Sequence, residues 1–123
     1  MNGMRKLLAS ASAVMLMSAA AVAFDAQTKS EIDELIAFVR NSGSRFIRNG
    51  TEYSAAEGAD HLRDKLNRAG DRVKTTEDFI DGVASKSSVS GKPYLVKFAD
   101  GRTQPAGDWL RKHLTELRKK KQP

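Results

Sequence analysis

The sequence contains no cysteine. This absence excludes disulfide bonds, thiol catalysis, thiolate metal sites and attachment of a lipid through cysteine. Histidine is almost as scarce, because His61 and His113 are the only two and lie in separate expected helices. His61 shares a helix face with Glu57, but no further ligand for a metal ion is evident. We therefore expect no metal site and no cofactor, and a packed or solvated position for both histidines.

The first 23 residues are typical of a bacterial signal peptide. Arg5 and Lys6 supply a positive end, residues 7–20 are apolar or small, and residues 21–23 form the small-x-small pattern that signal peptidase cleaves. A membrane anchor is the alternative, but the apolar run is shorter than the ~20 residues of a span and no stop-transfer segment follows. We expect cleavage after Ala23 and a periplasmic protein that is not a lipoprotein and has no membrane-spanning segment.

The remaining chain is long enough for one domain, expected at residues 24–118, with a basic tail at 119–123. The formal net charge of +6 is mostly a feature of the two ends, because basic residues lie in the signal segment and at Lys119, Lys120 and Lys121. A nucleic-acid surface needs clustered positive charge on the folded body. We therefore expect no nucleic-acid partner and a solvated tail, with weak attraction to anionic lipid headgroups as the alternative.

Four helices are expected along this domain. The first covers residues 28–42, where Thr28 with Glu31 forms a capping box and Ser30 offers a second register. Its apolar residues recur at helical spacing, which favours core packing over a partner-binding face. Gly43 ends this helix, because glycine readily adopts the left-handed conformation.

The second expected helix, residues 54–69, has the clearest boundaries. Ser54 and Glu57 form a capping box, and Gly70 ends the helix. Small residues on one side, Gly58 among them, allow a close approach to a neighbour. Asp64 and Arg68 have the i,i+4 spacing of a weak ion pair.

The other two helices are expected near residues 75–85, capped by Thr75 or Thr76, and over residues 105–120. The third is weakened by Gly82, by up to ~1 kcal/mol relative to alanine. In the last, Trp109, Leu110, Leu114 and Leu117 lie on the inner side.

A small β element completes the expected fold. Asn49-Gly50 predicts a tight hairpin, with Phe46 and Tyr53 as aromatic anchors on its two short strands. Residues 94–98 alternate as a longer strand, and residues 102–104 pair back briefly after an Asp-Gly turn. The fold class is α+β, about four helices packed on a small antiparallel β element of a short hairpin and one longer strand. An all-helical domain with irregular loops is the alternative.

The serine-rich segment 85–92 is the first candidate for a functional site. It does not form a phosphate-binding loop, because Lys86 stands where the motif needs glycine and Pro93 replaces the hydroxyl residue. A polar connection between a helix and a strand is favoured, since serine hydroxyls satisfy backbone groups. Binding is the second interpretation and serine catalysis the third. The candidate binding residues are Ser87, Ser88, Ser90, Lys92, Tyr94, Arg48 and Tyr53.

Other polar groups have weaker patterns. Four aspartates fall on the polar sides of helices and are expected to be solvated rather than paired for acid–base catalysis: Asp60, Asp64, Asp78 and Asp81. Three arginines near the hairpin, Arg45, Arg48 and Arg63, would suit an anionic ligand. Packing of their stems over aromatic rings is the favoured interpretation.

Several phrases together resemble a known family: "SGSRFIRNGTEYSAAEGADHLRDKL", "TTEDFI", "ASKSSVSGKPYLV" and "DGRTQPAGDWL". They are similar to the YfeK-like family of small bacterial periplasmic or secreted proteins, a domain family of unknown function. The resemblance covers residues 30–117. It implies one recurrent domain and lends no activity, cofactor or catalytic residue.

Two function hypotheses follow. The first is a non-catalytic binding or interaction module of the periplasm, with an unknown cell-envelope protein or ligand as partner. The second is a small cell-envelope hydrolase or transferase that uses one of Ser85, Ser87, Ser88 or Ser90 with a lysine or His61. Serine hydroxyls directed at backbone groups would count against the enzyme.

Overall fold

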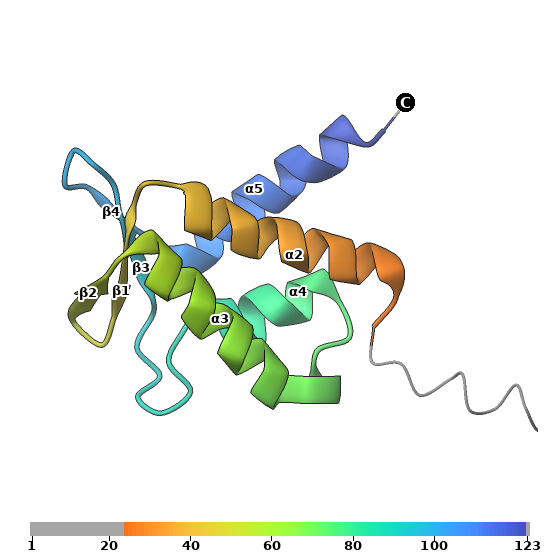
Figure 1. Cartoon of the computed structure of the whole chain (residues 1–123), viewed down its shortest axis with the longest axis horizontal. Coiled ribbons are helices and arrows are strands. Elements are labelled where there is room, and N and C mark those ends of the chain that lie inside the picture. Colours follow the sequence, from red (N-terminus) through yellow and green to blue (C-terminus); the bar gives the residue numbers. More distant parts are fainter. Residues whose placement is uncertain (1–23, 123) are drawn as a thin grey trace, which may run out of the picture.

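The computed structural model describes residues 24–122. The expected signal peptide and its cleavage site after Ala23 lie outside these residues. Within the described part, four α-helices and a four-stranded antiparallel sheet form an α+β fold, which confirms the predicted class (Figure 1). None of the helices between residues 24 and 122 has the length and apolar character that crossing a membrane requires.

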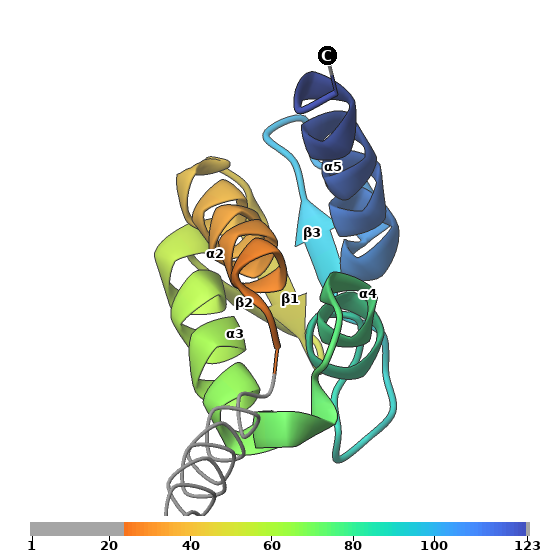
Figure 2. The same cartoon turned by 90° about the vertical axis from the view of Figure 1, so that its right-hand side faces the viewer.

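Two long helices, α2 (Ala26–Asn41) and α3 (Ala55–Ala69), lie side by side (Figure 2). Helix α2 starts earlier than predicted, because Asp25 is its N-cap and accepts a hydrogen bond from the Thr28 N–H at 2.8 Å. The predicted capping registers at Thr28 and Ser30 are therefore wrong. Glu31, expected to close a capping box, is instead buried in the core.

Helix α3 follows its prediction closely. Ser54 and Glu57 form the capping box, and Gly70 ends the helix with a φ of 58°. A Cβ atom on Gly58 would lie 2.7 Å from Cβ of Phe46, so the close approach of α3 to the sheet requires glycine there. The predicted ion pair between Asp64 and Arg68 is wrong, because the structure forms no such contact among the described residues.

The sheet has the strand order β2-β1-β3-β4, and its strands are β1 (Arg45–Arg48), β2 (Thr51–Tyr53), β3 (Leu95–Lys97) and β4 (Thr103–Pro105). The Asn49-Gly50 hairpin is confirmed, with positive φ angles of 50° and 82°. The brief pairing after the Asp-Gly turn is also confirmed, as β4.

The strand predicted at residues 94–98 is confirmed as β3 but is shorter than expected, with three residues. Tyr94 bonds elsewhere: its N–H donates to the Ser85 carbonyl, and its carbonyl accepts from the Ala106 N–H, both at 2.9 Å.

The helical side of the sheet is completed by α4 (Thr76–Phe79), its π-helical continuation η3 (Ile80–Ala84) and α5 (Ala106–Lys120). Thr75 caps α4 as predicted, and α5 packs on η3 across from α2 and α3 (Figure 2). Residues 119 and 120, assigned to the tail from the sequence, form the last turn of α5. One core of apolar residues lies between these helices and the inner face of the sheet, around Leu35, Phe46, Leu62, Phe79, Val96 and Leu110.

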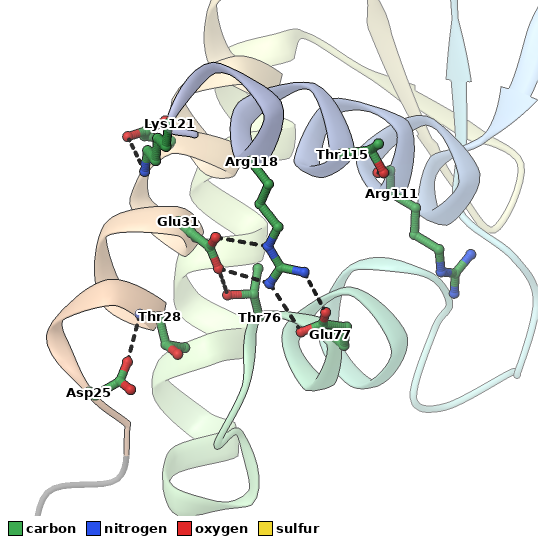
Figure 3. A network of polar contacts seen from close by, with 10 residues as sticks. Asp25, Thr28, Glu31, Thr76, Glu77, Arg111, Thr115, Arg118 and Lys121 are labelled. Carbon is green, nitrogen blue, oxygen red and sulfur yellow. Dashed lines mark hydrogen bonds and ion pairs between the residues drawn. The ribbon is translucent and has the colours of Figure 1, made fainter. Parts of the chain in front are cut away.

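A polar network around the buried Glu31 connects α2, α4 and α5 at the edge of this core (Figure 3). The Glu31 carboxylate, 2% exposed, accepts hydrogen bonds from Arg118 Nε and Nη2 at 3.0 Å each and from Thr76 Oγ1 at 2.6 Å. Arg118 also pairs with Glu77 at 2.8 Å. Arg118 and Thr76 outweigh the effect of burial and lower the pKa of Glu31 to about 2.

Candidate functional site: a cationic cleft

A cleft of about 890 Å³ opens between α3, η3 and the segment that leads from η3 to β3. That segment hangs below the sheet beside α3 (Figure 1). Four cationic side chains line this cationic cleft, namely Arg48, Lys65, Arg68 and Arg72, against one acidic residue, Asp78. The cleft is therefore strongly positive.

Helix α3 and the 3-10 turn that follows it, η2 (Gly70–Arg72), supply most of this charge. His61, Lys65 and Arg68 recur at intervals of four and three residues, which places them along one side of α3, and Arg72 lines the same cleft from beyond the end of the helix at Gly70. This polar stripe runs next to the apolar stripe that packs in the core. Arg48 joins it from the end of β1, where the strand alternation directs it to the same side of the sheet as Phe46.

Lys65 is the innermost cation of the cleft. It is 8% exposed, and its Nζ donates to the Lys86 carbonyl at 2.6 Å and to the Tyr94 hydroxyl at 3.1 Å. An ammonium group has three donors, so one remains for a group in the cleft. Burial lowers the pKa of Lys65, and the nearby charges of Arg48, Arg68 and Lys86 lower it further.

Tyr94 and His61 extend this hydrogen-bonded chain. The Tyr94 hydroxyl, which accepts from Lys65, also shares a hydrogen bond with His61 Nε2, 3.1 Å away. Burial, with the charges of Arg48, Lys65 and Arg68, lowers the pKa of His61 to about 4. His61 is thus neutral at pH 7, with one protonated ring nitrogen and one that can accept a hydrogen bond.

The positive charge of the cleft is not neutralised within the described residues. Arg48, Lys65, Arg68 and Arg72 form no ion pair there, although other arginines of the domain do, such as Arg40 with Asp60 at 2.6 Å.

The carboxylate of Asp78 is occupied by N-terminal helix contacts, since it accepts from the N–H groups of Lys74 and Thr75 at 3.0 and 3.2 Å. A buried cation without a counterion is costly, and an anion from solution would offset that cost.

The serine-rich segment is an ordered connection. Ser87 is buried, and its hydroxyl accepts from the N–H groups of Val89 and Ser90 at 3.3 and 3.2 Å. The Ser90 hydroxyl donates to Asn49 Oδ1 at 2.5 Å and accepts from the Lys92 N–H at 3.2 Å.

The hydroxyl of Ser85 donates to the Ile80 carbonyl at 2.6 Å. Within residues 24–122, these three hydroxyls contact backbone groups and Asn49 rather than a lysine, histidine or carboxylate side chain, which counts against three of the four serines of the enzyme hypothesis; the fourth, Ser88, lines the cationic cleft.

The structure brings together four of the seven candidate binding residues named from the sequence. Ser87, Ser88, Tyr94 and Arg48 line the cationic cleft. The other three do not line it: Ser90 serves the segment's own hydrogen bonds, Lys92 is exposed, and Tyr53 lies under the Arg48 guanidinium, 4.8 Å from its ring centroid.

Sequence reasoning overlooked three cations, Lys65, Arg68 and Arg72. The signal was present as basic residues at helical spacing beside an apolar stripe, but a charged stripe ordinarily indicates a solvated helix face.

Several other polar candidates form contacts outside the cleft, and the paired aspartates remain exposed. Asp60 pairs with Arg40, Asp81 with Arg111, and Arg45 with Glu52 on the outer face of the sheet. His113 stacks on Phe38, with ring centroids 3.6 Å apart. No group of three or more metal-ligating side chains occurs among residues 24–122.

Comparison with known proteins places this domain in a family. A family model matches residues 26–118 and describes a family of unknown function, DUF5329. The chain belongs to the DUF5329 family. The uncharacterized protein YfeK of Salmonella typhimurium is 36% identical over 92 residues, which cover 74% of this chain and 77% of that protein. The resemblance to YfeK-like proteins is thereby confirmed.

The DUF5329 match includes every residue that lines the cationic cleft. No solved structure matches this chain.

Proposed function

We propose that this DUF5329 protein is an exported, non-catalytic binding module that holds an anionic ligand in the cationic cleft. The observation that carries the proposal is the Lys65 ammonium, which is 8% exposed and has no carboxylate partner among the described residues. Arg48 and Arg68 add positive potential at the same place, as the lowered pKa values of Lys65 and His61 indicate. An anion would replace water as the third acceptor of Lys65 and neutralise a charge that folding has buried.

Anion binding is tested by titrating the purified protein with inorganic phosphate and with acetate, followed by NMR shifts of the backbone amides. Shifts that saturate at residues of the cleft are expected for the wild type. Lys65→Met should reduce affinity at least ~10-fold, because a charge-assisted hydrogen bond contributes about 1.5–3 kcal/mol.

Lys97→Met is the matched control, since it removes the same charge from the outer face of the sheet, where Lys97 pairs with Glu52. Arg68→Gln provides a second cleft variant at an exposed position that does not depend on tolerance of a core substitution. Equal affinity in the wild type, Lys65→Met and Arg68→Gln would refute the site. An equal loss in Lys97→Met would mean that net charge rather than the cleft attracts the anion.

The export half of the proposal rests on the signal-like pattern of residues 1–23 and on the YfeK-like resemblance. Cell fractionation followed by N-terminal sequencing tests it separately. A periplasmic protein that begins at Phe24 is expected, and an uncleaved protein in the cytoplasmic fraction would overturn it.

A further inference from the structure

The cationic cleft combines two kinds of surface. Lys65, Tyr94 and His61 form a polar inner end, while Ala69, Val73, Val83 and Val89 contribute apolar side chains. Its volume of about 890 Å³ lies within the range of small-molecule sites, ~300–1,000 Å³. An inorganic anion is only a few times the size of a water molecule, which takes up ~30 Å³. Most of the cleft around such an anion would therefore remain filled with water.

The second observation is the exposure of the Val89 side chain. This side chain is 99% exposed, and Val89 is the one large hydrophobic residue within residues 24–122 that is exposed to solvent. It sits at the tip of a segment that is fixed by hydrogen bonds, since Ser87 accepts from the Val89 N–H and Ser90 is bonded to Asn49 of the hairpin. An apolar side chain is thus held in solvent at the edge of a cationic site.

The third observation is the open space beside Gly82. Gly82 lines the cleft from η3, and a Cβ atom placed on it would meet nothing within 4 Å. The absence of a side chain leaves open space over the π-helical turn. A larger residue at this position would extend into that space without meeting a neighbouring atom at its Cβ.

From these observations we infer that the ligand of the cationic cleft is a small amphiphilic anion, an aliphatic or aromatic group that carries one carboxylate or phosphate. The inference rests on the proposed anion-binding function. The anionic group accepts a hydrogen bond from Lys65, near the positive charges of Arg48 and Arg68. The apolar part extends over Gly82 and covers Val89.

The test compares ligands that differ only in their apolar part. Octanoate is titrated against acetate, and octyl phosphate against inorganic phosphate, below the concentrations at which the octyl compounds form micelles. Burial of each methylene group multiplies affinity by about four, so burial of two groups gives a gain of about 15-fold. We expect octanoate and octyl phosphate to bind at least ~10-fold more tightly than acetate and phosphate.

Two substitutions locate the apolar part. Gly82→Leu fills the open space and Val89→Ser removes the exposed apolar side chain, so both should lower octanoate affinity at least ~3-fold while acetate affinity is unchanged. Octanol, which has the chain without the charge, should bind at least ~10-fold more weakly than octanoate.

The outcomes separate this inference from the proposed function. Equal affinities for octanoate and acetate would overturn the amphiphile and leave the anion site standing. No binding of any anion would overturn both, and octanol that binds as tightly as octanoate would mean an apolar site without anion recognition.

An additional binding experiment with lipid vesicles distinguishes a free amphiphile from a membrane lipid. Cosedimentation with phosphatidylglycerol vesicles in the absence of binding to the octyl compounds would replace the small ligand by a lipid surface. Binding of the monomeric octyl compounds without cosedimentation supports the inference.

Discussion

Replacement of Arg118 by methionine tests the polar network in the core. Methionine keeps much of the apolar stem of arginine but removes the guanidinium that neutralises Glu31 (Figure 3). The lowered pKa of Glu31, about 2 against 4.5, corresponds to about 3 kcal/mol of differential interaction. Thr76 supplies part of this, and the Arg118 side chain is 41% exposed, so solvent screens its share. We therefore expect Arg118→Met to lower the free energy of unfolding by about 2 kcal/mol.

The assay is urea denaturation at pH 7, followed by circular dichroism. Arg111→Met is the matched control, because Arg111 lies on the same helix and pairs with Asp81 and Asp108 at the exposed surface. Its loss should cost less than ~1 kcal/mol, as is typical of surface ion pairs. A double variant, Glu31→Gln with Arg118→Met, should be more stable than Arg118→Met alone, because the buried charge has been removed with its partner.

A second readout is the response to acid. A carboxyl group whose pKa is lowered by folding stabilises the fold when the pH is above the pKa of the unfolded chain. For Glu31 that stability is lost as the pH falls from about 4.5 to 2. Arg118→Met should therefore lose less stability over this interval than the wild type. If Arg118→Met and Arg111→Met are equally stable, or if the double variant recovers nothing, the assignment of Arg118 as the counterion of Glu31 is wrong.

Two further predictions concern packing and pH. Gly58→Ala should lower the free energy of unfolding by about 1–3 kcal/mol, because the new Cβ would meet Phe46. The Tm should fall by roughly 4–8 °C per kcal/mol, whereas the control Gly82→Ala should be neutral or stabilising by up to ~1 kcal/mol. Equal melting temperatures of the two variants would refute the packing argument. His61, with a pKa of about 4 in the fold against 6.5, binds fewer protons when folded, so stability should fall as the pH drops from 6.5 to 4. Urea titrations at pH 7 and pH 5 should show a smaller difference for His61→Gln than for the wild type, and an unchanged difference would contradict the neutral His61.

The sequence predicted those features that depend on local chemistry. The hairpin at Asn49-Gly50 and the caps at Ser54 and Thr75 were confirmed because each rests on residues within a few positions of one another. The start of α2 was missed for the opposite reason. Glu31 fits a local capping box, but its carboxylate is instead bonded to Thr76 and Arg118, far along the chain.

The cationic cleft was only half accessible to sequence reasoning. Tyr94 and Arg48 were named as candidates, whereas Lys65 was not, because charged residues on a helix are ordinarily solvated. What buries Lys65 is the segment before β3, which folds back so that the Lys86 carbonyl reaches its ammonium group. The spacing of residues within either segment does not indicate such a contact between distant parts of the chain.

The link between Glu31 and Arg118 joins residues that are 87 positions apart. During synthesis, α2 and α3 emerge long before the guanidinium that neutralises Glu31 and the apolar side of α5 that closes the core. Contacts of this range are slow to form, and the exposed core of a waiting chain is open to chaperones and proteases. Folding of the domain is therefore completed only after α5 has been made, and a proteolytic cut ahead of α5 would remove its apolar side together with the guanidinium that neutralises Glu31.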